Sequence, residues 1–158
     1  MRGECEIVIC TFVGHREPVV SRLYERLSGV LEELAGGEDR LTFYVGGHSG
    51  FDSMGAEAVR QLKATHAAMD IRLILVLPYM TSRLNSEQCY ASAFDEIFVL
   101  DRASMVHPKR AILVRNQWIV EQSDVIIACV QRDYGGAYQT LKYARQRGKR
   151  IVDMTAAK

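Results

Sequence analysis

Residues 124–141 read DVIIACVQRDYGGAYQTL and join an apolar run to a glycine pair. The run at residues 124–130 predicts a strand buried on both faces, because its β-branched and small apolar residues do not alternate with polar ones. Beyond Gly135 and Gly136, apolar residues recur at helical spacing up to Gly148. The stretch therefore predicts a strand, a glycine turn and a helix, an arrangement that directs unpaired backbone N–H groups at an anion.

The glycine pair has two interpretations. A helix N-terminus carries about half a positive charge and free N–H donors, and a Cβ in the turn would hold a phosphate group away from them. The same pair is also typical of an ordinary tight turn between a strand and a helix. Taken alone, Gly135 and Gly136 leave both a phosphate site and a plain turn open.

Length and composition favour a single domain that spans residues 1–158. With 158 residues, of which 48% are hydrophobic, the chain can bury one full core, whereas two half-sized domains would each be marginal. The net charge is +1, and basic and acidic residues are interspersed. This charge pattern argues against duplex nucleic acid as the partner.

The sequence also predicts a cytoplasmic protein. It shows no secretory signal pattern and no apolar segment of about eighteen residues, so we expect no membrane partner. The four cysteines form no Cys-x-x-Cys pair, and the four histidines have no zinc-ligand spacing. We therefore expect reduced cysteines, no metal site and no resident cofactor.

Strands and helices are predicted to alternate along the chain. We expect strands at residues 5–13, 41–45, 71–77, 95–100, 124–130 and 151–154. We expect helices from Pro18 to the glycines at 36–37, at residues 53–65 and 109–122, and from the glycine pair to Gly148, with a loop at residues 80–90. This alternation predicts an α/β fold, a Rossmann-like three-layer α/β/α arrangement with a mostly parallel sheet.

Glycine-rich and polar segments follow three of the predicted strands, at residues 14–17, 46–52 and 131–136. In open parallel sheets, ligands bind outside the carboxyl ends of the strands, near the point where the strand order reverses. The three segments are therefore expected to meet in one ligand site.

These segments resemble motifs of the SLOG superfamily of Rossmann-like nucleotide-binding domains, which includes the LOG phosphoribohydrolases and the DNA-processing protein DprA. The turn Gly14–Arg16 is similar to the Gly-His-Arg turn of its small YpsA-like branch, and Gly50–Asp52 is similar to that branch's glycine-aspartate turn. Arg115–Asn116 and the loop Gly135–Ala137 with Thr140 resemble the arginine and the phosphate loop of the LOG enzymes. The resemblance implies a ligand-binding set of Gly14, His15, Arg16, Gly50, Asp52, Arg115, Asn116, Gly135, Gly136, Ala137 and Thr140.

The loop departs from the LOG pattern at one catalytic position. LOG enzymes carry a glutamate three residues beyond the loop threonine, whereas Thr140 is followed by Leu141, Lys142 and Tyr143. A carboxylate stabilises the oxocarbenium-like state of glycosidic cleavage, and a lysine opposes it.

Glu17 and Asp52 are the candidate catalytic carboxylates if the chain nevertheless cleaves a glycosidic bond, as acid or nucleophile. Each also has a structural interpretation. Glu17 beside Pro18 suits the first turn of a helix, and Asp52 suits a helix N-cap.

The sequence thus predicts a binding or sensor module for a nucleotide or a nucleotide-derived small molecule. Arg16 and Arg115 are expected to grip the phosphate, and Tyr134 could stack on a base. Two alternatives stay open: an N-glycosidic hydrolase or transferase acting on a nucleoside monophosphate, and an interaction module associated with single-stranded DNA. Spare apolar helix residues, such as Leu113 and Val120, favour a homo-oligomer, most simply a dimer.

Overall fold

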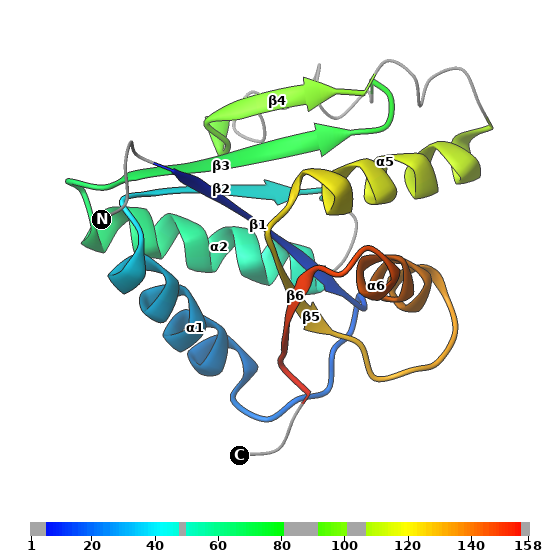
Figure 1. The fold of residues 1–158 in the computed structure, drawn as a ribbon, viewed down its shortest axis with the longest axis horizontal. Helices are drawn as coiled ribbons and strands as arrows, with labels where there is room; N and C mark the ends of the chain where they lie inside the picture. Colours follow the sequence, from blue (N-terminus) through cyan, green and yellow to red (C-terminus); the bar gives the residue numbers. More distant parts are fainter. Residues whose placement is uncertain (1–5, 48–49, 81–91, 101–106, 156–158) are drawn as a thin grey trace.

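The structure is a computed structural model of the chain and describes residues 6–47, 50–80, 92–100 and 107–155. Six strands form one sheet in the order β4-β3-β2-β1-β5-β6, and every neighbouring pair is parallel (Figure 1). The predicted α/β, Rossmann-like fold is confirmed. The strands are β1 (Ile7–Gly14), β2 (Arg40–Val45), β3 (Asp70–Leu77), β4 (Glu96–Val99), β5 (Val125–Cys129) and β6 (Arg150–Asp153).

Helices cover both faces of this sheet, which makes three layers (Figure 1). The helices are α1 (Leu23–Gly37), α2 (Gly50–Thr65), α5 (Pro108–Gln122) and α6 (Gly136–Gln146). On one face α1 packs beside α2, and on the other α5 packs beside α6. None of the helices in the described part of the chain has both the length and the apolar character needed to cross a bilayer. The loop predicted at residues 80–90 lies outside the described residues, except for Met80.

The strand order reverses beside β1. From β1 the chain moves outward through β2 and β3 to β4, and it then returns to place β5 on the other side of β1. The crossovers on the two sides of β1 therefore lie on opposite faces of the sheet, which leaves a crevice at the carboxyl ends of β1 and β5. The sheet topology thus determines where a ligand site can form.

Four clusters of buried apolar residues lie among the described residues, and the two largest hold the layers together around the site. The larger one joins the sheet to α1 and α2 and includes the fully buried Leu27, Phe43 and Ile127. The smaller one joins β1 and β5 to α5 and α6 and includes Val120, which is 0% exposed. Val120 was therefore wrongly assigned to a spare surface, because its side chain faces the sheet. Leu113, on the same helix, is 38% exposed.

Helix α1 begins at Leu23, so the predicted start at Pro18 is wrong. The side-chain amide of Gln131 accepts a hydrogen bond from the backbone N–H of Val19 at 2.8 Å and donates one to its carbonyl at 2.6 Å. Both backbone groups of Val19 are therefore bonded to the β5–α6 loop. The chain then passes through Arg22 in the left-handed region, at φ 55°, before the helix starts.

Helix α2 begins at Gly50, three residues before the predicted start, and its first turn packs directly on the β1–α1 loop. The backbone N–H of Phe51 donates to the carbonyl of His15 at 3.2 Å. A Cβ on Gly50 would lie 1.8 Å from the carbonyl oxygen of Arg16. Only glycine fits at this position, because the obstacle is backbone and cannot turn aside.

This contact predicts that Gly50→Ala lowers the free energy of unfolding by about 1–3 kcal/mol or more, since the added methyl group forces the loop and helix apart. The matched control is Gly29→Ala in α1, where nothing lies within 4 Å of an added Cβ. That change should raise stability by about 0.5–1 kcal/mol, because alanine favours a helix interior. Urea unfolding of the two variants measures the difference. Equal stability of the two would contradict the close approach at Gly50.

Candidate functional site

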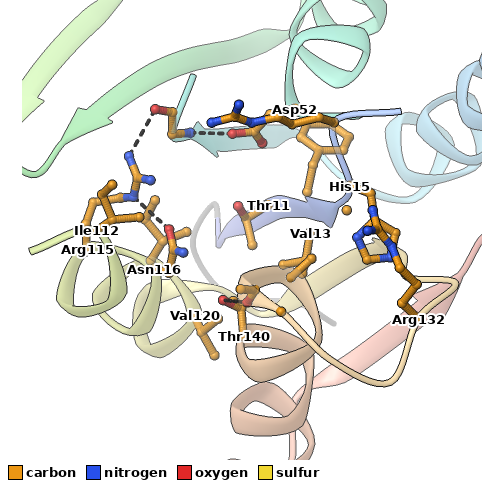
Figure 2. A pocket seen from close by; sticks show the side chains of 18 of the residues that line it. Thr11, Val13, His15, Asp52, Ile112, Arg115, Asn116, Val120, Arg132 and Thr140 are labelled. Carbon is orange, nitrogen blue, oxygen red and sulfur yellow. Dashed lines mark hydrogen bonds between the residues drawn. The ribbon is translucent and has the colours of Figure 1, made fainter. Parts of the chain in front are cut away.

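A cavity of about 440 Å³ opens at the crevice between the carboxyl ends of β1 and β5. Its walls come from β1, the loops that follow β1 and β5, and the facing parts of α5 and α6 (Figure 2). Two of the predicted residues, Glu17 and Gly50, are not part of the lining. The predicted residues that line it are Gly14, His15, Arg16, Asp52, Arg115, Asn116, Gly135, Gly136, Ala137 and Thr140.

The N-terminus of α6 forms one wall of this cavity. Its N-cap is Gly135, at φ 91°, with no side-chain cap and no acidic residue in the first turn. The first backbone bond runs from the N–H of Gln139 to the carbonyl of Gly135, so the N–H groups of residues 136–138 have no acceptor within the helix. Thr140 donates its hydroxyl to the carbonyl of Gly136 at 2.9 Å, which stabilises this turn. The helix dipole and these N–H groups favour an anion.

Arg115 is 2% exposed and is bonded to the protein itself (Figure 2). Its Nη1 donates to the carbonyls of Gly46 at 3.0 Å and Val76 at 3.1 Å, and its Nε donates to Oδ1 of Asn116 at 2.8 Å. A Cβ on Gly46 would lie 2.7 Å from the guanidinium, so glycine is required there. The arginine therefore joins α5 to the ends of β2 and β3, and its charge lies in the cavity wall.

Asp52 lies in the first turn of α2 and is 8% exposed. Its Oδ2 accepts hydrogen bonds from the backbone N–H groups of Gly46 at 2.8 Å and Gly47 at 3.0 Å. The predicted N-cap position is therefore wrong, because the helix begins before Asp52 and the carboxylate holds the loop that precedes it. Gly46 is bonded through its N–H to Asp52 and through its carbonyl to Arg115.

His15 joins the two loops at the mouth of the cavity. Its side chain is 8% exposed, and its Nε2 accepts the backbone N–H of Gln131 at 3.0 Å. A ring nitrogen that accepts must be unprotonated, so the ring is neutral and carries its proton on Nδ1. Burial, together with the nearby charge of Arg132, lowers the pKa of His15 below its ordinary value. These contacts give the histidine a structural role, because its ring holds the β5–α6 loop against the β1–α1 loop.

Two exposed arginines, Arg16 and Arg132, border the cavity on the side of His15. The guanidinium of Arg132 lies 5.6 Å from the ring centroid of Tyr134, which is 61% exposed. Arg132 was not predicted as a binding residue, although a basic residue just before the glycine pair was a usable signal. Thr11 and the apolar residues Val13, Ile112 and Ile119 of the lining carried no sequence signal of a site, because they look like ordinary core residues.

Neither metal nor thiol chemistry is supported by the described residues. Among them, no three His, Cys, Asp or Glu side chains lie close enough to hold a metal ion. Cys10 and Cys129 are buried free thiols, and burial raises the pKa of Cys10 to about 12. A thiol with so high a pKa is a poor nucleophile near neutral pH.

The sequence matches no known family model and no curated protein. Solved structures do match. DNA processing protein A from Streptococcus pneumoniae aligns at a TM-score of 0.67 and 16% identity, over 93% of this chain and 50% of that one. The same protein from Helicobacter pylori aligns at 0.62 and 18% identity, over 92% and 64%. The molybdenum cofactor binding protein from Rippkaea orientalis aligns at 0.62 and 18% identity, over 95% and 77%.

These similarities show the fold alone, because all the identities are below 20%. These matches confirm the Rossmann-like fold, whereas membership of the SLOG superfamily stays a prediction. The assignment to the YpsA-like branch stays a prediction. The chain spans about half the length of the Streptococcus pneumoniae protein.

The environment of His15 predicts a loss of stability at mildly acidic pH. Below the ordinary histidine pKa of about 6.5, the unfolded chain takes up a proton that the folded ring resists. The contribution of His15 to the free energy of unfolding is therefore complete above this pH. It falls as the pH drops toward the lower pKa of the folded state. His15→Gln, which retains an acceptor for Gln131 but does not titrate, should show a smaller loss. Urea unfolding between pH 7.5 and 5.5 measures both proteins, and identical losses would contradict the interpretation.

Proposed function

We propose that this protein binds a nucleotide or a nucleotide-derived small molecule in the cavity, with the phosphate at the start of α6. One observation carries the proposal: the uncapped N-terminus of α6 opens into the cavity, beside the exposed Arg16 and Arg132. Backbone N–H groups at a helix start and guanidinium groups are common donors to phosphate in proteins. Asp52, the one acidic side chain among the described residues of the lining, has an oxygen already bonded to two N–H groups.

The size and the walls of the cavity agree with such a ligand. Small-molecule sites commonly enclose about 300–1,000 Å³ and combine apolar walls with a few polar groups. Here Val13, Ile112 and Ile119 supply an apolar surface for a ring, whereas the arginines lie at the mouth. The binding of a nucleotide-sized molecule is thus favoured over the capture of a bare inorganic anion.

The site favours binding over glycosidic cleavage. Tyr143, which stands where LOG enzymes carry their glutamate, donates its hydroxyl to Glu121 of α5 at 2.5 Å. Glu17 is exposed and outside the lining, so Asp52 would have to act alone in the hydrolase or transferase alternative. We therefore propose a binding or sensor module, cytoplasmic and homo-oligomeric as the sequence predicts.

Single-stranded nucleic acid is the second candidate ligand. It is favoured by Tyr134, an exposed aromatic ring next to Arg132 at the rim of the cavity. Aromatic stacking beside basic side chains is the usual way in which proteins hold single strands. The Helicobacter pylori protein of similar fold is described as binding single-stranded DNA, and the Rippkaea orientalis protein as binding the molybdenum cofactor.

The phosphate position is tested with Gly136→Asp and its uncharged isostere Gly136→Asn. Nothing lies within 4 Å of a Cβ at Gly136, so both variants should fold. The aspartate places a negative charge on the N–H groups that would hold the phosphate. Calorimetric titration with nucleoside monophosphates should therefore show binding that is about ten- to a hundred-fold weaker for Gly136→Asp than for Gly136→Asn.

Equal affinities of these two variants would refute a phosphate at this helix. A short single-stranded oligonucleotide in the same titration separates the two ligand classes. Much tighter binding of the oligonucleotide, with a steep loss as salt rises, would favour the nucleic acid candidate, because phosphate contacts along a strand release counterions.

A further inference from the structure

Helix α5 presents an amide within an apolar wall of the cavity. Ile112, Asn116 and Ile119 are spaced four and three residues apart, so they share one face of the helix, and all three line the cavity. Asn116 is half-buried, whereas the arginines at the mouth are exposed. A polar side chain in such a wall is placed to recognise one feature of a ligand.

The orientation of this amide is determined by Arg115. The Nε of Arg115 donates to Oδ1 of Asn116 at 2.8 Å, and a guanidinium has no acceptor, so the amide oxygen must face it. Arg115 cannot turn away, because it is buried and its Nη1 is bonded to the carbonyls of Gly46 and Val76. Figure 2 shows the oxygen of Asn116 turned toward Arg115.

The amide nitrogen is therefore left to serve as a donor. Among the described residues, Arg115 is the only hydrogen-bond partner of the Asn116 side chain. Since no described residue accepts from Nδ2, its two N–H groups are available to water or to a ligand in the cavity. A ligand that displaces this water must offer an acceptor, or it leaves the donor unpaired.

Asn116 and Arg132 lie on different sides of the cavity. In Figure 2, Arg115 and Asn116 are on the α5 side, whereas His15 and Arg132 are on the opposite side. A nucleotide whose phosphate contacts α6 and Arg132 would direct its base toward α5. The contact of Asn116 would then be with the base.

We propose that Asn116 is a specificity-determining residue that donates a hydrogen bond to a carbonyl oxygen of the nucleobase, which selects keto bases over their amino counterparts. This inference rests on the proposed binding of a nucleotide. An exocyclic amino group in the same place would set donor against donor, and the pairing would be lost. The wild-type protein should therefore bind uridine 5′-monophosphate about tenfold more tightly than cytidine 5′-monophosphate, and inosine 5′-monophosphate more tightly than adenosine 5′-monophosphate.

The decisive variant is Asn116→Asp. One carboxylate oxygen replaces Oδ1 as the acceptor for Arg115, and the other turns the donor of the cavity into an acceptor. The added negative charge weakens the binding of every nucleotide. It acts equally on two nucleotides of the same charge, so its effect cancels in the ratio of their affinities. The preference for the keto base should therefore be lost or reversed. Gln117→Glu is the matched control, because it adds the same charge on the next residue, which is not part of the lining.

Calorimetric titration of the wild type, Asn116→Asp, Asn116→Ala and Gln117→Glu with the four nucleotides measures these ratios. Ribose 5-phosphate is the probe that lacks a base, and Asn116→Ala should leave its affinity unchanged. Thermal unfolding of each variant establishes that it is folded. A lost or reversed ratio in Asn116→Asp, with the wild-type ratio retained in Gln117→Glu, supports the proposal.

Three results would overturn the proposal. The ratio of the affinities for keto and amino nucleotides could be the same in all four proteins. Alternatively, Asn116→Ala could weaken the binding of ribose 5-phosphate as much as that of the nucleotides, which would place Asn116 on the phosphate. Either result leaves the proposed function standing if Gly136→Asp still weakens binding. If the wild type binds none of the nucleotides, both proposals fail together.

Discussion

The buried guanidinium of Arg115 is the contact on which the site depends. A charged group removed from water is costly unless hydrogen bonds compensate it, and here the carbonyls of Gly46 and Val76 accept from Nη1 at 3.0 and 3.1 Å. These carbonyls mark the carboxyl ends of β2 and β3, so the arginine attaches α5 to the edge of the sheet where the cavity opens. Loss of the guanidinium would leave two buried acceptors unpaired in the wall of the cavity.

The two sides of the cavity differ in how firmly their polar side chains are held. On the α5 side, Arg115 and Asn116 are held by hydrogen bonds, and neither of them is exposed. On the other side, Arg16 and Arg132 are exposed and can adjust to an incoming anion. A rigid side suits the recognition of a specific group, whereas flexible cations suit attraction and neutralisation.

Much of the fold could be predicted from the sequence, because the apolar periods of its strands and helices are regular. The six strands were found within one or two residues of their bounds, and three of the site segments were expected at one edge of the sheet. The start of α1 was missed, because the amide that holds Val19 belongs to Gln131, 112 residues away. Val120 was misassigned for a related reason, since periodicity does not tell which side of a helix faces the sheet.

The sequence by itself determined the alternation of strands and helices, the glycine turn before α6 and the set of polar segments at the strand ends. These features are local, because they follow from backbone freedom at glycine and from side-chain periodicity. The tertiary structure alone decided what each polar residue does there. Arg115, expected to hold a phosphate, bonds to two strand ends, and Asp52, expected to cap a helix, holds the preceding loop. Such roles depend on hydrogen-bond partners that come near only when the chain has folded, whether they are distant along the sequence or lie in a neighbouring loop.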